Sequence, residues 1–386
     1  EPIGVLFKQN KALGRHAGGV IISENIPQQM PLIMARGELQ TPWTEGMTNK
    51  HLEEFGWIKF DLLGLETLRI IERTVEQILK KQGVENPTFE EMLCWYNENI
   101  APDVINFDDQ KVYENIYHAG RWAGIFQCTQ RGAQALFKRA KPESVVDLAT
   151  LTSIYRPGPL SAKVDKLYIQ NKKRPETIEY GHPLIENVLK ETYGCIIFQE
   201  QVMALCHLVA GIPKDECNAM RKMMKPVSSG SDNIDKAKKL QEKFIKGAMA
   251  NGVSQSIAKS LYEKILFFAG YGFNKSHAVS YAVNSYHCAW LMTYYEDEWI
   301  KAYLEAASGN PKKLAKAVSE VKGLGYKIVP IDVNHAEKTW TTVGKKQLMP
   351  SFLSCKGIGS AAVDEILANR PYTSIENLLW NDDGSW

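Results

Sequence analysis

The chain has 386 residues, a formal net charge of +2, and 44% hydrophobic and 23% charged residues. This composition is ordinary for a soluble protein of two or three domains, and it excludes the fibrous, collagen-like and disordered classes. No apolar run reaches the roughly 20 residues that a membrane-spanning helix needs. Because the net charge is near zero, any affinity for nucleic acid must come from local basic patches.

The beginning of the chain is expected to mix strands and turns. In the segment Gly14-Arg15-His16-Ala17-Gly18-Gly19, a cation and an imidazole precede a glycine pair, which lets the backbone approach a ligand closely, although a structural turn explains the same residues. The β-branched run that follows, residues 20–22, predicts a buried strand. A polar, hairpin-like region comes next.

Residues 57–68 are predicted to begin as a strand and to continue through a glycine-bearing turn into a helix over residues 66–82. Side chains alternate between the two faces of a strand, so one face carries Lys59 and Asp61. The opposite face carries only apolar side chains and is expected to enter a core: Ile58, Phe60 and Leu62. Asp61 is a possible ligand for a divalent metal and Lys59 a possible phosphate contact, while an exposed ion pair is the simpler alternative.

Residues 83–106 carry two prolines and several polar residues, and they predict an irregular connection. From there to about residue 325 helical periodicity dominates. The predicted helices cover residues 109–118, 129–139, 144–153, 161–171, 182–191, 198–210, 213–225, 233–250, 254–268, 276–307 and 311–323. A loop rich in helix breakers is expected over 225–233, a short strand over 327–330, and two short helical runs over 351–380.

Acidic pairs and cysteines point to no separate catalytic or metal site. Asp108 and Asp109 precede a helical run, so we interpret them as a helix N-cap rather than as metal ligands. A second acidic pair, at 382–383, lies in the polar end of the chain. The seven cysteines include no CxxC pair, and buried, reduced thiols are expected.

Two basic clusters could meet phosphates. In Tyr155-Arg156-Pro157-Gly158-Pro159-Leu160 the prolines hold the backbone around Arg156, either to present its guanidinium or simply to connect two helices. In the run at 220–225, Arg221 and Lys225 share one helical face with Lys222 beside them. A solvated surface is the alternative interpretation of this second cluster.

A third cluster lies at 270–278, where a glycine-flanked aromatic loop is expected to end at Ser276 as the N-cap of a long helix. Lys275 and His277 beside that helix N-terminus would suit a phosphate, although the Tyr-, Ala- and Trp-rich helix itself is more typical of a core.

The segment at 352–362 fits a helix-hairpin-helix. Its turn, Lys356-Gly357-Ile358-Gly359, exposes backbone N–H groups at a helix start, an arrangement that binds duplex phosphates without reading sequence. An ordinary turn between two helices shares this pattern. If the motif is present, Lys356, Gly357 and Gly359 are the DNA-binding residues.

Taken in order, these segments resemble the catalytic alpha subunit of bacterial DNA polymerase III, the C family of replicative DNA polymerases. The matching stretches are HAGGVIIS, IKFDLLGLETL, GIFQ, YRPGPL, ETYGCIIFQEQVM, MRKMMK, FAGYGFNKSHAVSYAV and the KGIG hairpin. They follow one another as in the family and span nearly the whole chain.

The resemblance implies an α+β fold in three parts. Residues 1–82 would form the C-terminal half of a mixed-sheet palm of the polymerase beta-like nucleotidyltransferase type. Residues 83–325 would form mostly helical fingers, and residues 326–386 a linker and the helix-hairpin-helix region. The implied activity is DNA-directed DNA polymerisation, in which dNTPs are added to a primer 3′-hydroxyl with two Mg²⁺ ions.

The resemblance also assigns individual residues. Asp61 matches the third of three metal-binding palm aspartates, and Lys59 matches a lysine near the triphosphate. Arg221 and Lys222 match a pair that is usually two arginines, so bidentate phosphate binding by the second position is in question here. Two further groups complete the set: the nucleotide pocket, with Arg156, Lys275 and His277, and the neighbourhood of the palm site, with Arg15 and His16.

The first two palm aspartates of the family, carried on a DxD segment ahead of HAGG, are not in this sequence, so we expect a piece of a longer protein, from a split gene, processing or a partial chain. The implied partners are primer–template DNA, dNTPs, an upstream palm segment and, through other regions, the sliding clamp and further replisome subunits. The implied location is the bacterial cytoplasm, of the cell or of a phage-infected host. The alternatives are a non-catalytic DNA-binding or replisome-assembly piece and a helical scaffold.

Overall fold

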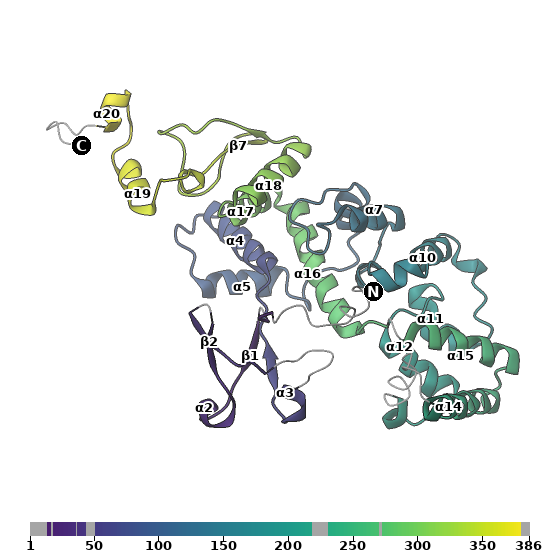
Figure 1. Cartoon of the computed structure of the whole chain (residues 1–386). Helices are drawn as coiled ribbons and strands as arrows, with labels where there is room; N and C mark the ends of the chain where they lie inside the picture. Colours follow the sequence, from purple (N-terminus) through teal and green to yellow (C-terminus); the bar gives the residue numbers. More distant parts are fainter. Residues whose placement is uncertain are drawn as a thin grey trace, which may run out of the picture. The chain divides into compact units, whose positions relative to one another are not determined.

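The computed structural model describes residues 14–16, 18–35, 37–43, 51–217, 231–269 and 272–379. The chain divides into two compact units, Glu1–Glu66 and Thr67–Trp386 (Figure 1). Among the described helices, none combines the length and the apolar character needed to cross a membrane.

The first unit contains two small antiparallel sheets. Strand β1 (Gly19–Ile21) pairs with β4 (Lys59–Asp61), and β2 (Ile33–Ala35) pairs with β3 (Glu38–Gln40). The second pair confirms the expected hairpin-like region. Two single-turn helices accompany the sheets, α2 (Ile26–Gln29) and α3 (His51–Glu54).

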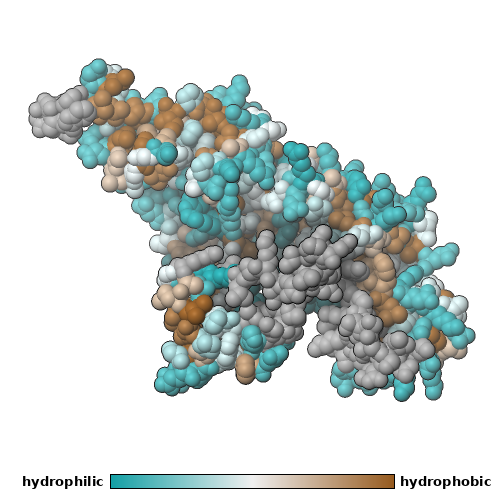
Figure 2. Space-filling model, viewed as in Figure 1, coloured by the Kyte–Doolittle hydropathy of each residue, from teal (hydrophilic) through white to brown (hydrophobic). Residues whose placement is uncertain are grey.

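The expectation that the apolar face of the 57–62 strand enters a core is wrong for this unit. Ile58, Phe60 and Leu62 are 70%, 45% and 68% exposed, and Val20 of β1, expected in a buried strand, is 41% exposed. Hydrophobic side chains are visible at the surface of this part of the molecule (Figure 2). A two-stranded sheet buries a face only where another layer covers it, and the described residues of this unit supply no such layer.

The second unit is mostly helical. Its helices are α4 (Glu66–Lys81), α5 (Phe89–Asn99), α6 (Gln110–Val112), η1 (Tyr113–His118), α7 (Arg131–Ala140), α8 (Val145–Ile154), α9 (Pro157–Ser161), α10 (Val164–Lys173), η2 (Pro175–Thr177), α11 (Pro183–Leu189), η3 (Lys190–Thr192), α12 (Gln199–Ala204), η4 (Leu205–Val209), α14 (Ser231–Ala250), α15 (Gln255–Ala269), α16 (Lys275–Tyr294), α17 (Glu296–Ala307) and α18 (Pro311–Gly323). A small sheet follows in the order β5 (Lys327–Ile328), β7 (Gln347–Met349), β6 (Thr341–Gly344), and the unit ends with η5 (Phe352–Ser354), α19 (Ser360–Ala368) and α20 (Ile375–Leu379).

These elements confirm the α+β class and most of the predicted helices. Residues 83–106 are not simply irregular, because α5 lies within them. Its N-terminus is a capping box in which the Thr88 hydroxyl accepts from the Glu91 N–H at 3.2 Å and Glu91 accepts from the Thr88 N–H at 2.8 Å. The single helix predicted over 276–307 is two helices, with Tyr295 between α16 and α17. The helix expected over 213–225 and the loop over 225–233 lie largely outside the described residues.

The main core forms around α16, which runs alongside α8. Small side chains at four-residue spacing, Ala278, Ala282 and the nearby Ser285 and Ala289, allow this close approach, and nine residues of the helix are buried. The helix is therefore a core element, as its composition indicated. The boundary between the two compact units falls at the start of α4, whereas the predicted boundary between palm and fingers, at residue 82, falls after this helix. The domain boundaries therefore stay a prediction.

Smaller features also match their predictions. Asp109 is the N-cap of α6 and accepts from the Lys111 N–H at 3.1 Å, and its other oxygen accepts from the Tyr294 hydroxyl at 2.6 Å. All seven cysteines are free thiols, five of them buried, while Cys94 is exposed and Cys355 is half-buried.

Candidate functional site

In the first unit, the pairing of β1 with β4 gathers three of the predicted site residues. Asp61 lies opposite Gly19 in the strand register, at the end of β4. The Lys59 Nζ atom lies 2.9 Å from Asp61 Oδ1, and His16 Nε2 lies 3.7 Å from the same oxygen. The Asp61 carboxylate is half exposed, whereas only 11% of the Lys59 side chain is. The buried stem of Lys59 thus presents its ammonium directly beside an accessible carboxylate.

The glycine pair at the start of β1 is required by this close pairing. A Cβ atom on Gly18 would lie 2.6 Å from the Leu62 carbonyl oxygen, and a Cβ on Gly19 would lie 2.9 Å from Lys59 Cδ and 3.1 Å from His16 Nδ1. The Leu62 N–H donates to the Gly18 carbonyl at 2.7 Å, which continues the strand pairing past Asp61. Glycine is therefore needed here for close approach of two backbones.

The charge state of this cluster follows from its hydrogen bonds. The hydrogen bond and charge of Lys59 lower the pKa of Asp61, with a further contribution from His16, so the carboxylate is ionised at neutral pH. The Gly18 N–H donates to His16 Nδ1 at 3.2 Å, which leaves Nε2 as the protonated nitrogen of the neutral ring. Arg15, expected near the same site, forms an ion pair with Glu38 of β3.

The described residues do not make up a two-metal site. Within residues 14–16, 18–35, 37–43, 51–217, 231–269 and 272–379, no group of three or more His, Cys, Asp and Glu side chains is placed to hold a metal ion. Asp61 offers one carboxylate, and the ammonium beside it would compete with a cation for that oxygen. The cluster supplies at most part of such a site.

In the second unit, Arg156 and His277 are brought together through Phe273. Arg156 is the N-cap of α9, and its guanidinium carbon lies 4.6 Å from the centre of the Phe273 ring. The Phe273 and His277 rings meet edge-on, with centroids 5.4 Å apart, and His277 lies 4.1 Å from Tyr281. The result is a row of a guanidinium and three rings in which Arg156 and His277 are both exposed. Flat cationic and aromatic groups in this order suit a planar base or an anion.

Lys275, at the start of α16, is engaged by two carboxylates. Its Nζ atom lies 2.6 Å from Glu191 Oε1, and its backbone N–H donates to Glu200 at 2.8 Å. The N-cap of α16 is Asn274 rather than the predicted Ser276: its side-chain oxygen accepts from the His277 N–H at 2.8 Å. Carboxylates thus already occupy the cationic end of this helix, where a phosphate was expected to bind.

Sequence reasoning missed three residues of this site, Phe273, Glu191 and Glu200. In the sequence, Phe273 stands out only as part of an aromatic loop. The glutamates lie 84 and 75 residues before Lys275, so nothing in the local pattern connects them to it. The bridge between Phe198 and Phe273 brings these segments together, with the Phe273 N–H donating to the Ile197 carbonyl at 3.1 Å.

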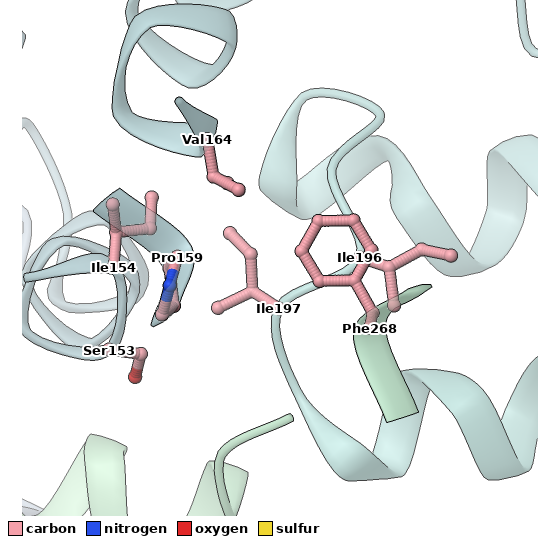
Figure 3. Close-up of a pocket in the computed structure, with 7 residues that line it drawn as sticks. All are labelled: Ser153, Ile154, Pro159, Val164, Ile196, Ile197 and Phe268. Atoms are coloured by element: carbon pink, nitrogen blue, oxygen red, sulfur yellow. The ribbon is translucent and has the colours of Figure 1, made fainter. Parts of the chain in front are cut away.

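A cavity of about 10 Å³ lies beneath the Arg156 turn, lined by Ser153, Ile154, Pro159, Val164, Ile196, Ile197 and Phe268 (Figure 3). It has room for about one water molecule, and six of its seven lining residues are apolar. The cavity is a small packing gap where α9 and the start of α10 pack against the 196–197 segment and Phe268.

The predicted hairpin turn lies between η5 and α19. Gly357 has φ +96°, a conformation that favours glycine, and Gly359 is the N-cap of α19 with no side-chain capping bond. Lys356, Gly357 and Gly359 are all exposed. The first of the two predicted helical runs is a single 3₁₀ turn, and Ile358 packs against a small core around Phe352 and Val363. The turn therefore presents the free N–H groups of a nine-residue helix to solvent.

Arg221 and Lys222 lie outside the described residues. The Asp61 cluster and the Arg156–His277 row belong to different units.

Two family models match this chain. The one described as the finger domain of the bacterial DNA polymerase III alpha subunit matches residues 67–252, and a helix-hairpin-helix motif matches residues 325–383. The first match begins where the second compact unit begins.

Curated relatives extend the similarity over nearly the whole chain. The DNA polymerase III subunit alpha of Campylobacter jejuni is 34% identical over 94% of this chain, and that of Aquifex aeolicus is 32% identical over 94%. The same subunit of Staphylococcus aureus is 34% identical over 92%. This chain covers 29%, 29% and 31% of these three proteins, less than a third of each.

Proposed function

Because this chain belongs to the family of bacterial DNA polymerase III alpha subunits, we propose that it contributes the fingers and part of the palm of a DNA-directed DNA polymerase. The reaction is attack of a primer 3′-hydroxyl on the α-phosphate of a dNTP, with release of pyrophosphate. In this proposal residues 1–82 belong to the palm, 83–325 to the fingers and 326–386 to the linker and helix-hairpin-helix region. The observation that carries the proposal is the finger-domain match over residues 67–252.

Within the palm part, we assign Asp61 as one ligand of the Mg²⁺ site and Lys59 as a cation for the triphosphate. Their support is geometric: an exposed, ionised carboxylate at a strand end with an ammonium 2.9 Å away. The remaining carboxylates would come from an upstream palm segment, since Asp61 belongs to no group of three or more His, Cys, Asp and Glu side chains placed to hold a metal among the described residues. When bound, the metal ions supply charge stabilisation for the attacking and leaving oxygens.

Within the fingers, we assign Arg156, Lys275 and His277 to the nucleotide pocket, together with Arg221 and Lys222. The exposed Arg156 guanidinium, held against Phe273, is fixed in direction and costs little side-chain entropy on binding. Lys275 would exchange its carboxylate partner for a phosphate.

The helix-hairpin-helix region would hold duplex DNA by its backbone. The exposed N–H groups around Gly357 and Gly359, with Lys356 beside them, form a sequence-independent phosphate contact. We place the protein at the replication fork in the bacterial cytoplasm, of the cell or of a phage-infected host. Its partners there would be primer–template DNA, dNTPs and, through other regions, the sliding clamp and further replisome subunits.

Primer extension tests this function. We expect no extension by the chain alone and extension when a segment carrying the other palm carboxylates is co-expressed. Asp61→Asn should abolish that extension, while Asp103→Asn, which changes an exposed carboxylate in the second unit, should not. Extension that survives Asp61→Asn would overturn the assignment of Asp61.

The second candidate is a non-catalytic DNA-binding piece of the replisome, which the helix-hairpin-helix match favours. A salt-dependent affinity for duplex DNA that does not change with dNTP and Mg²⁺, together with no extension in the co-expression experiment, would decide for it.

A further inference from the structure

Helices α7 and α10 lie side by side in the second unit (Figure 1). An open groove of about 880 Å³ lies along the two helices. Six cationic side chains line it, all on exposed residues: Lys138, Arg139, Lys141, Lys166, Lys173 and Arg174. The other lining residues are Ile169, Gln170 and Thr177, so no carboxylate of the described part of the chain lines this groove.

The positive charge here is far above that of the chain as a whole. Residues 131–177 carry ten lysines and arginines against four aspartates and glutamates, in a protein whose net charge is +2. Of the six lining cations, only Arg139 forms an ion pair with another described residue, Asp165 at 3.2 Å. Like charges at this density repel one another, and a bound anion would relieve that repulsion. The groove is therefore expected to attract anions.

Helix dipoles account for part of this arrangement but not for all of it. Lys138 and Arg139 lie in the last turn of α7 and Lys173 in the last turn of α10, where the negative end of each helix attracts cations. Lys166 lies in the first turn of α10, where the positive end of the helix dipole does not favour a cation. The dipoles also do not explain why both helix ends face one groove.

The groove rests on a rigid base. Lys172, only 9% exposed in its side chain, lies 2.6 Å from Asp147 and also donates to the Lys141 carbonyl at 3.0 Å. The Tyr168 hydroxyl donates to the same aspartate at 2.6 Å. These contacts join the end of α7 to α10 and α8, so the cations are presented from fixed backbones.

We propose that this groove binds the phosphodiester backbone of DNA, at a place separate from the nucleotide pocket. The volume is far larger than one phosphate needs. Among the described residues that line the groove none is aromatic, and the half-buried Ile169 is the one aliphatic side chain. Small-molecule pockets and protein interfaces depend on such apolar anchors. A row of lysine and arginine without them is what backbone contacts to nucleic acid require. The choice of DNA as the polyanion rests on the proposed function.

Arg156, Lys275 and His277, which we assign to the nucleotide pocket, are not among the residues that line the groove. Its binding would therefore not depend on dNTP, and it would not read sequence, because every strand presents the same phosphates.

The test compares two variants of the full chain, each with four exposed lysines changed to glutamine. The groove variant changes Lys138, Lys141, Lys166 and Lys173, and leaves the buried Lys172 intact. The matched control changes four exposed lysines of α15 and α18: Lys259, Lys264, Lys312 and Lys322. Binding of a labelled single strand, a labelled duplex and a polyglutamate peptide is measured by fluorescence anisotropy over a series of salt concentrations, and circular dichroism checks that each variant is folded.

We expect the groove variant to lose at least about tenfold in DNA affinity, and its plot of log K against log salt to become shallower by about 0.7 to 0.9 for each lysine that contacts a phosphate. The control should bind DNA with the same affinity as the unchanged chain.

A larger loss of affinity for the single strand or for the duplex identifies which form of DNA the groove binds. If the folded groove variant binds DNA as the unchanged chain does, the proposal that the groove binds DNA is wrong, while the proposed function is unaffected. If the groove lysines are needed for binding polyglutamate but not DNA, the proposal is also wrong, and the groove binds an acidic protein partner. A chain that binds no DNA in any form overturns the DNA-binding part of the proposed function as well.

Discussion

Replacing Glu191 by glutamine should tighten the binding of dNTP. Lys275 Nζ lies 2.6 Å from Glu191 Oε1, so a phosphate that binds Lys275 must first displace this carboxylate. The two side chains are 32% and 35% exposed, and an ion pair of this exposure contributes about 0.2–1 kcal/mol. Removing the competition should therefore lower the Kd for dNTP by at most about fivefold. Glutamine keeps the shape of the side chain and its hydrogen bond capacity but not its charge.

The assay is calorimetric titration with a dNTP and Mg²⁺, on the chain alone and on the chain together with the upstream palm segment. Lys275→Gln, which removes the proposed phosphate contact, should raise the Kd by about tenfold or more, since a hydrogen bond to a charged group contributes about 1.5–3 kcal/mol. The matched control is Glu216→Gln, which breaks an exposed ion pair with Lys243 in the same unit and should leave the Kd unchanged.

The two variants together test whether Lys275 binds a phosphate and whether Glu191 competes for it. If Lys275→Gln leaves the Kd unchanged, Lys275 makes no phosphate contact, whatever Glu191→Gln does. If Lys275→Gln weakens binding but Glu191→Gln weakens it as well, the glutamate orients the lysine rather than competing for it.

Three further predictions concern the scaffold around these sites. Asp147→Asn should destabilise the fold by about 1.5–3 kcal/mol, because it removes the nearer and more buried of the two carboxylates that pair with the 9%-exposed Lys172 ammonium and leaves only the exposed Glu143 at 3.1 Å, and Asp147→Leu combined with Lys172→Met should recover much of that loss in urea unfolding. Burial lowers the pKa of His287 from 6.5 to about 4, so the protonated unfolded state gains on the native state as pH falls: stability should be constant above about pH 6.5 and decrease by about 3 kcal/mol towards pH 4, with a flatter profile for His287→Gln. Gly18→Ala should abolish primer extension with the upstream segment, because its methyl would lie 2.6 Å from a backbone carbonyl of the paired strand, while Gly64→Ala, with open space around it, should retain activity; equal activities would refute the close-approach argument.

Much of the fold could be predicted from local signals. The helices of the second unit follow from apolar spacing, and Asp109 was identified as a cap because a carboxylate before a helical run accepts free N–H groups. Thr88 followed three residues later by Glu91 is the sequence pattern of the α5 capping box, but the prolines on either side of this helix favour an irregular segment. The break at Tyr295 has no comparable signal, since helical residues continue on both sides of it.

Burial of the first unit was predicted wrongly for a different reason. Alternation along residues 57–62 specifies which side chains share a face, but it cannot specify whether a second layer covers that face. The exposed Ile58, Phe60 and Leu62 belong to a sheet of two strands. What covers a face is a property of the whole assembly of layers and not of the strand.

By itself, the sequence determined the class of the fold, the order of its motifs and the residue types at each candidate site, because periodicity, caps and glycine positions act over a few neighbouring residues. Only the tertiary structure decided which of those residues meet. It placed Glu191 against Lys275 across 84 residues, stacked Arg156 on Phe273, and brought two ordinary basic helix ends, α7 and α10, around one groove. Such contacts arise from the packing of distant segments, and electrostatic forces, which act through space, depend on that packing and not on position along the chain.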